Sequence, residues 1–211
     1  PDEELVRRTR EGAAERYPDH LPEKVKKLLE HELALVRELR YAPYFLTVHD
    51  IVRWARGEAD PRALVVYETM WGSTAEMAHA IAEGIAAAGV EARVLPVPQT
   101  DHTTVVGELL EAKGIVLGSP THNRRMLLNV AALLEDLIGL RPVAKLGAAF
   151  GSHGWSGGAV PLLEKGLKEA GIEVVQEGLA LTWRPTAEER AQAMAWGQAF
   201  GKHVLETLSG G

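Results

Sequence analysis

The chain has 211 residues, with 29 acidic and 23 basic side chains and a formal net charge of −6. This balance argues against a nucleic-acid-binding protein, because such proteins usually carry an excess of basic residues. The sequence contains no cysteine, which excludes disulfides, thiolate catalysis and cysteine-ligated iron clusters. No apolar run is long enough to span a membrane, and the charged start lacks the apolar core of a signal peptide. We therefore expect a cytoplasmic protein with one medium-sized domain and a smaller appendage.

The first sixty residues differ in composition from the rest of the chain, because residues 2–40 are dense in both charge signs and poor in glycine. Pro22 suits the first turn of a helix. The apolar residues that follow it share one helical face; they are Val25, Leu28, Leu29, Leu33, Leu35, Val36 and Leu39. Pro43 separates this helix from a second one, which carries Phe45, Val48, Val52 and Ala55 on one side. The pattern predicts a helical hairpin with an apolar side to bury.

Two stretches of this segment, Leu28–Leu39 and Tyr44–Arg56, resemble part of the bacterial replicative DNA polymerase α-subunit family, in particular its error-prone branch. The resemblance covers residues 3–57. The family pattern continues into a glycine-arginine-glycine-serine stretch and catalytic aspartates, and neither follows Gly57. Since a polymerase needs clustered carboxylates to hold two Mg²⁺ ions, we expect no polymerase activity. The adjacent His49 and Asp50 are interpreted as a solvated helix face and not as a metal site.

A cluster of helix-breaking residues, Gly57-Glu58-Ala59-Asp60-Pro61, predicts a boundary between a helical appendage over residues 1–57 and a domain over residues 58–211. Beyond it, strands and helices are expected to alternate. The expected strands are 63–67, 90–97, 114–118, 146–150 and a last strand region over 172–181; the expected helices are 74–88, 103–112, 127–138, 158–170 and 186–208. This alternation predicts an α/β fold with a doubly wound, five-stranded parallel sheet, whose ligands bind beyond the carboxyl ends of the strands.

The loop after the first strand has the features of a phosphate site. The hydroxyl residues Thr69, Ser73 and Thr74 surround Gly72, where bare backbone can approach a ligand. The next helix begins here, so its free N–H groups and positive dipole end lie in this loop. The loop has no Walker lysine and no dinucleotide fingerprint, which favours a single terminal phosphate monoester. The same hydroxyls are equally typical of an ordinary helix N-cap.

Two further loops are expected at the same edge of the sheet, over Gly118–Met126 after the third strand and Gly151–Gly158 after the fourth. Both are rich in small, hydroxyl or amide residues, which offer backbone N–H groups to a flat, polar heterocycle. Trp155, flanked by glycines, suits contact with a ring face. A single loop tryptophan is also commonly packed against a neighbouring helix, so both interpretations of Trp155 stay open.

Three motifs, Thr69–Thr74, Ser119–Asn123 and Gly151–Gly157, resemble the three FMN loops of the flavodoxin-like domain of flavodiiron proteins. The likeness covers about residues 60–208 and implies a flavodoxin-like fold that binds FMN. It implies that the FMN phosphate is bound by Thr69, Met70, Trp71, Gly72, Ser73 and Thr74. It also implies that two loops flank the flavin ring, with Pro120, Thr121, His122 and Asn123 on one side and Ser152, Gly154, Trp155, Ser156 and Gly157 on the other.

Four positions depart from the pattern of that family. Leu128 stands where proline is usual, Arg124 and Arg125 where asparagine or glycine is usual, and His153 where an aromatic is usual. Two arginines near the ring would favour the anionic reduced flavin and raise its reduction potential. They are alternatively a docking patch for an acidic redox partner, or a solvated loop pair.

The histidines decide which activity of that family is expected. All eight stand apart, without an H-x-H or H-x-x-x-D cluster, so we expect neither a metal site nor the diiron chemistry of the flavodiiron proteins. The main hypothesis is an FMN-binding electron-transfer domain with a protein redox partner and no catalytic acid–base residue. One alternative is an NAD(P)H-dependent quinone or flavin reductase that acts as a homodimer. In this alternative Arg124 and Arg125 contact a phosphate of the nucleotide. Another is an interaction or nucleic-acid module led by residues 1–57.

Overall fold

A computed structural model describes residues 1–18, 20–55 and 60–209 of the chain. The chain divides into two compact units, Pro1–Arg56 and Gly57–Gly211. The predicted boundary between residues 57 and 58 lies outside the described residues. Each unit is described by itself below.

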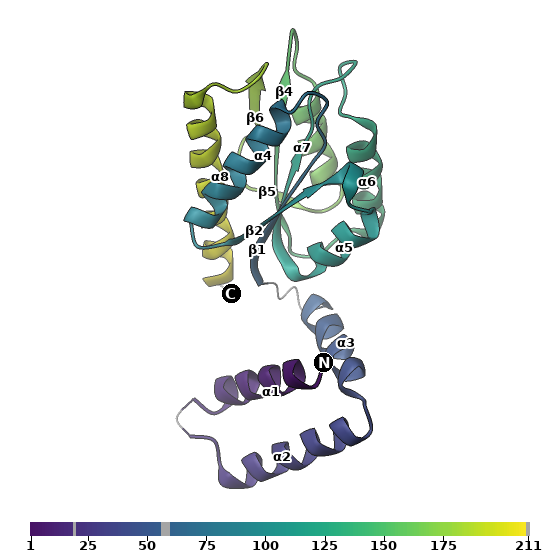
Figure 1. Cartoon of the computed structure of the whole chain (residues 1–211), viewed down its shortest axis with the longest axis vertical. Helices are drawn as coiled ribbons and strands as arrows, with labels where there is room; N and C mark the ends of the chain where they lie inside the picture. Colours follow the sequence, from purple (N-terminus) through teal and green to yellow (C-terminus); the bar gives the residue numbers. More distant parts are fainter. Residues whose placement is uncertain (19, 56–59, 210–211) are drawn as a thin grey trace. The chain divides into compact units, whose positions relative to one another are not determined.

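The described part of the first unit is helical, with α1 over Asp2–Arg16, α2 over Glu23–Glu38 and α3 over Ala42–Ala55 (Figure 1). The two later helices form the predicted pair, with Pro22 at the N-cap of α2 and Pro43 in the first turn of α3. Helix α1 was not predicted, because its sequence has little apolar periodicity. Its first turn is acidic, which favours a helix N-terminus through the helix dipole.

A polar contact joins α1 to α3. Arg8 forms an ion pair with Asp50 and lies 2.9 Å from His49 Nδ1. Burial would raise the pKa of Asp50, but hydrogen bonds from His49 and Arg8 outweigh it and the pKa is lowered. The interpretation of His49 and Asp50 as a solvated face was therefore wrong in part, since both are half-buried around Arg8.

The apolar face predicted on α2 is only partly covered: Val25, Leu29, Leu33 and Val36 are half-buried, and α2 has no buried residue. The largest exposed side chains on it are Leu28, Leu35 and Leu39. On α3, the side chains of Val52 and Ala55 lie outside what the structure describes.

The second unit contains a six-stranded, parallel sheet in its described residues. Its strands are β1 (Asp60–Tyr67), β2 (Glu91–Pro96), β3 (Ala112–Gly118), β4 (Leu146–His153), β5 (Glu173–Val174) and β6 (Leu179–Thr182). The strand order is β2-β1-β3-β4-β5, and β6 also pairs with β4. This order confirms the doubly wound α/β prediction and puts the reversal of direction between β1 and β3, where such sheets bind ligands.

The predicted count of five strands was wrong by one, because the last strand region is split into β5 and β6. Both pair with β4, β5 near its start and β6 near its end. Between them the backbone bonds to helices instead: the Gly178 N–H donates to Glu164 Oε1 at 2.7 Å, and the Glu177 carbonyl accepts from Trp196 Nε1 at 2.9 Å. These tertiary hydrogen bonds interrupt the ladder.

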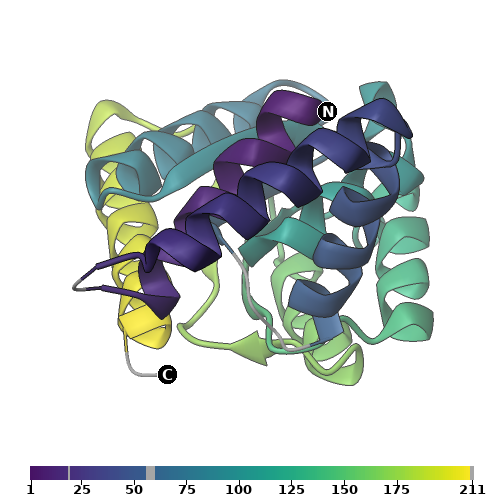
Figure 2. The same cartoon turned by 90° about the horizontal axis from the view of Figure 1, so that it is seen from below.

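Helices cover both faces of the sheet. One face carries α4 (Ser73–Ala87) and α8 (Ala187–Ser209). The other carries α5 (His102–Glu111), α6 (Leu128–Leu140) and α7 (Ala159–Glu169), with a short 3₁₀ helix, η1 (Val97–Gln99), before α5. In Figure 2 the yellow α8 and the green α6 lie on opposite sides of the sheet. No described helix is long and apolar enough to cross a membrane.

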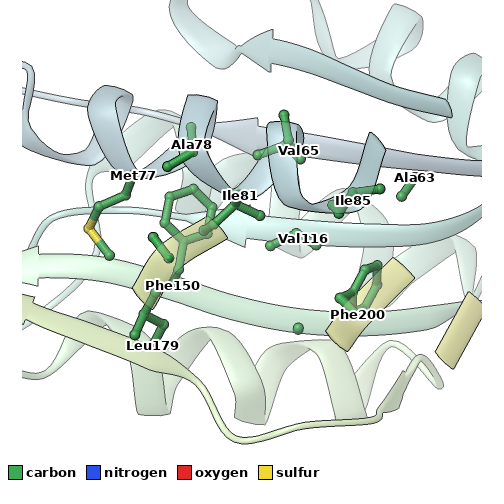
Figure 3. Close-up of a cluster of buried hydrophobic side chains, with 14 of the residues drawn as sticks. Ala63, Val65, Met77, Ala78, Ile81, Ile85, Val116, Phe150, Leu179 and Phe200 are labelled. Carbon is green, nitrogen blue, oxygen red and sulfur yellow. The ribbon is translucent and has the colours of Figure 1, made fainter. Parts of the chain in front are cut away.

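The core under α4 and α8 fixes the position of α4. Met77, Ile81 and Ile85 of α4 point at strand side chains, and Phe200 of α8 lies beside them (Figure 3). The helices approach closely through glycine, since a Cβ on Gly197 would lie 2.2 Å from the Ile81 carbonyl oxygen. This close packing fixes α4 against α8 and the sheet, and the first residue of α4, Ser73, follows the carboxyl end of β1.

Candidate functional site

A cavity of about 430 Å³ opens at the carboxyl ends of β1, β3, β4 and β6. Its lining comes from four loops: Met70, Trp71 and Ser73; Pro120, Thr121, His122, Asn123 and Arg124; Ser152, His153, Gly154, Trp155 and Ser156; and Trp183. The structure therefore brings the three predicted loops together. Of the predicted residues, Thr69, Gly72, Thr74 and Gly157 do not line the cavity and lie next to residues that do.

The hydroxyl residues of the first loop do not cap α4. The N-cap is Gly72, in the left-handed region at φ +90°, and no described side chain caps this helix. The Ser73 and Thr74 hydroxyls instead hydrogen-bond to Ser152 Oγ on β4, at 2.8 and 3.2 Å. Thr69 Oγ1 accepts from the Gly72 N–H at 3.1 Å and closes the loop. The alternative of an ordinary serine or threonine N-cap is therefore not what the structure shows.

In each of the other α-helices of this unit, a side-chain oxygen accepts a hydrogen bond from a backbone N–H of the first turn. The hydrogen bonds are accepted by Asp101 at α5, Glu68 at α6, Thr121 at α7 and Thr186 at α8, at 2.9, 3.1, 3.1 and 3.2 Å. The hydrogen bonds from Thr104 lower the pKa of Asp101. Among the described α-helices of this unit, only α4 thus begins without a side-chain acceptor. Its free N–H groups and positive dipole end suit an external anion.

The second loop is a tight turn, and its backbone shows why asparagine or glycine is usual at one of the departing positions. His122 and Arg125 exchange backbone hydrogen bonds at 2.8 and 2.9 Å. Between them Asn123 and Arg124 both have positive φ, +49° and +64°, as in a type I′ turn. Asparagine and glycine suit these positions, so Arg124 occupies a backbone conformation that normally favours glycine. Arg124 lines the cavity, whereas Arg125 does not.

The third loop approaches the second through glycine and carries an exposed tryptophan. A Cβ on Gly151 would lie 2.1 Å from the Ser119 carbonyl oxygen, so only glycine fits there. The Trp155 side chain is 93% exposed. It packs edge-on against Trp183, with ring centroids 5.1 Å apart and an interplanar angle of 83°. Trp155 therefore lies at the cavity with an aromatic neighbour, and is not packed against a helix.

Trp183 is a cavity residue that sequence reasoning missed. It directly follows β6, and its backbone N–H donates to the His153 carbonyl at 2.8 Å. The rule that placed the first three loops at one edge applies equally to the loop after the last strand. The predicted last strand region ends at residue 181, two residues before Trp183.

The charges at the cavity differ from those of the whole chain. Among the described residues that line the cavity, Arg124 is the one Lys or Arg, and none is Asp or Glu. A chain of net charge −6 therefore presents a locally cationic opening. An anionic group is favoured there by this charge and by the open end of α4.

These features fit FMN. The open first turn of α4 and the hydroxyls around it suit a phosphate monoester. The cavity beside it has the volume of a small-molecule site and exposed indole rings at its opening. Among the described residues no group of three or more His, Asp or Glu side chains could hold a metal ion.

Comparison with known proteins agrees with this geometry. The model of the flavodoxin family matches residues 65–197. The chain belongs to the flavodoxin family, and its strand order is the one found in flavodoxin itself. It contains an FMN-binding electron-transfer domain. A second model, the bacterial DNA polymerase III alpha NTPase domain, matches residues 3–77, which confirms the polymerase resemblance at the start of the chain.

The similar proteins include both short flavodoxins and longer enzymes. An archaeal flavodoxin structure is 33% identical with a TM-score of 0.64; the match covers 68% of this chain and 99% of that one. A rubredoxin oxygen:oxidoreductase from Desulfovibrio gigas has a TM-score of 0.72 at 30% identity, over 74% of this chain and 39% of that one. A nitric oxide reductase from Moorella thermoacetica is 40% identical over 155 residues, 73% of this chain and 39% of the relative. The chain thus spans about two fifths of the length of these longer relatives, and their similarity confirms the relation to flavodiiron proteins.

Proposed function

We propose that residues 58–211 form a domain that binds one FMN at the cavity and passes electrons between protein partners. The observation that carries the proposal is the uncapped start of α4, which opens beside a cavity lined by the three predicted loops and Trp183. The FMN phosphate is assigned to the first loop, formed by Thr69, Met70, Trp71, Gly72, Ser73 and Thr74. The flavin ring is assigned to the other two loops, formed by Pro120, Thr121, His122 and Asn123 and by Ser152, Gly154, Trp155, Ser156 and Gly157.

Each loop has a distinct task in this proposal. The Ser73–Ser152 hydrogen bond of 2.8 Å ties the phosphate loop to β4, so the N–H groups of α4 are held in place before binding. The Asn123–Arg124 turn presents backbone groups and one cation to the ring. Arg124 favours the negatively charged reduced flavin over the neutral oxidised one. Bound FMN supplies one- and two-electron transfer, and the chain binds it, orients it and sets its potential.

The partner is proposed to be another protein, reached in the cytoplasm through the opening of the cavity. Met70 and Trp71 line the cavity and are exposed large apolar side chains. Exposed aromatic and basic side chains are common in protein contacts. No acid–base residue is assigned a catalytic role, because electron transfer needs none. The first unit is assigned no polymerase activity.

FMN binding by loop variants tests the site. Thr69→Ala removes the hydroxyl that accepts from the Gly72 N–H, and we expect weaker FMN binding in a flavin fluorescence titration. Thr103→Ala, an exposed threonine on α5, is the matched control and should bind FMN like the unaltered protein. Unchanged binding by Thr69→Ala would contradict the assignment of the first loop.

Reduction by nicotinamide nucleotides distinguishes an electron carrier from a reductase. The FMN-loaded protein is mixed anaerobically with excess NADPH or NADH while the flavin absorbance is followed. We expect negligible bleaching over minutes and full bleaching by dithionite. Rapid bleaching by NADPH that is lost in Arg124→Gln would support the reductase and overturn the carrier proposal.

A further inference from the structure

Trp183 has a backbone conformation that bulky side chains rarely adopt. Its φ is +61°, in the left-handed region, which costs an L-residue free energy relative to the right-handed one. Such strain persists only where neighbouring structure enforces it, and it is concentrated at functional sites. Here the Trp183 N–H bonds to the His153 carbonyl at 2.8 Å and extends the β4–β6 ladder. This hydrogen bond directs the indole over the third loop.

The third loop is shaped to receive that indole. A Cβ on Gly154 would lie 2.8 Å from two ring atoms of Trp183, so the absence of a side chain at Gly154 makes room for the ring. Trp183 then meets Trp155 edge to face, with centroids 5.1 Å apart. Trp155 is 93% exposed. The contact with Trp183 is its one ring contact among the described residues. The direction of the Trp155 indole therefore depends on Trp183.

We propose that Trp183 is a positioning residue, which holds the Trp155 indole in the orientation that receives the flavin ring. The inference rests on the proposed function and deepens it by adding a residue from a fourth loop. An exposed indole that is already oriented loses less conformational entropy when a ligand binds. Edge-to-face aromatic pairs have a modest coupling, so the expected effect on FMN affinity is a few-fold to tenfold.

A double-mutant cycle on FMN affinity tests this coupling. Trp183→Gly removes the ring and leaves a residue suited to the left-handed backbone, so the variant should fold. We expect it to weaken FMN binding three- to tenfold in the unaltered protein, and to have no effect in a Trp155→Ala background. Equal weakening in both backgrounds, or no weakening in either, overturns the inference. Arg141→Gly is the matched control, since Arg141 also has a left-handed backbone (φ +49°) and does not line the cavity.

Circular dichroism of the apoprotein gives a readout that needs no flavin. Two indoles this close couple their transitions, so we expect an exciton signal that is lost in Trp183→Gly and in Trp155→Ala and kept in Trp196→Phe. Loss of the signal with unchanged FMN affinity overturns the positioning role while the proposed function stands. If the unaltered protein binds no FMN, the proposed function and this inference both fail.

Discussion

Gly72 and Gly89 provide a matched pair for testing the first loop. They stand at the two ends of α4, with φ of +90° and +92°, and a Cβ at either would meet nothing within 4 Å. Substitution by alanine therefore costs backbone strain without any clash. The left-handed conformation costs an L-residue about 1–2 kcal/mol, and the lower entropy of the unfolded chain returns about 0.4–1 kcal/mol. Each variant should thus lose about 1 kcal/mol of unfolding free energy.

The two variants should differ in ligand binding. At about 2–4 °C per kcal/mol for a chain of this size, both should melt a few degrees lower without FMN. In a flavin fluorescence titration only Gly72→Ala should bind FMN more weakly, by tenfold or more, equivalent to about 1.4 kcal/mol. The reason is that its Cβ occupies the open space beside the first turn of α4, where the phosphate is proposed to bind.

Two results would refute this reasoning. If Gly72→Ala and Gly89→Ala bind FMN equally well, the space beside Gly72 does not receive the phosphate. If the apoprotein melting temperatures differ by much more than a degree or two, the premise that both substitutions cost only backbone strain is wrong.

Three further predictions concern contacts within the second unit. Ser152→Ala leaves the fully buried Thr74 hydroxyl without its partner, so the free energy of unfolding measured by urea denaturation should fall by about 1–3 kcal/mol. The control Ser209→Ala removes an exposed hydroxyl on α8 and should leave the free energy of unfolding almost unchanged. Gly197→Ala puts a Cβ 2.2 Å from the Ile81 carbonyl oxygen and should cost at least about 1–3 kcal/mol. By contrast, Gly139 lies in α6 with open space around it, so Gly139→Ala should raise the free energy of unfolding by about 0.5–1 kcal/mol. If Gly139→Ala lowers it instead, the steric explanation of the Gly197→Ala loss is wrong. Asp101 has a lowered pKa in the folded protein, so its stabilising effect is present above its unfolded pKa and is lost as pH falls through the folded value. The stability difference between the unaltered protein and Asp101→Asn, measured by urea denaturation from pH 7 downward, should be present at pH 7 and decline below about pH 4; a difference that grows on acidification would contradict the assignment.

The meeting of three loops at one edge could be predicted, because parallel strands joined by helices end on the same side of a sheet. The sequence pattern of β1, β3 and β4 was sufficient for that. The state of the α4 N-terminus could not be predicted in the same way. Whether Ser73 and Thr74 cap their own helix depends on Ser152, which is distant in sequence and adjacent only after folding.

The missed features have related causes. The split between β5 and β6 results from hydrogen bonds to Glu164 and Trp196 on two helices, which no local pattern announces. Trp183 was missed because the last strand region was ended at residue 181. Helix α1 was missed because its signal is charge at the helix ends, and not apolar periodicity.

The central claim is that the first turn of α4 binds the phosphate of FMN. It is tested most directly by titrating the apoprotein with FMN and with riboflavin, which has the same ring system and no phosphate. The account predicts one retained FMN per chain and at least 100-fold weaker binding of riboflavin, about 2.7 kcal/mol. Equal affinity for the two flavins, or no retention of FMN, would contradict it.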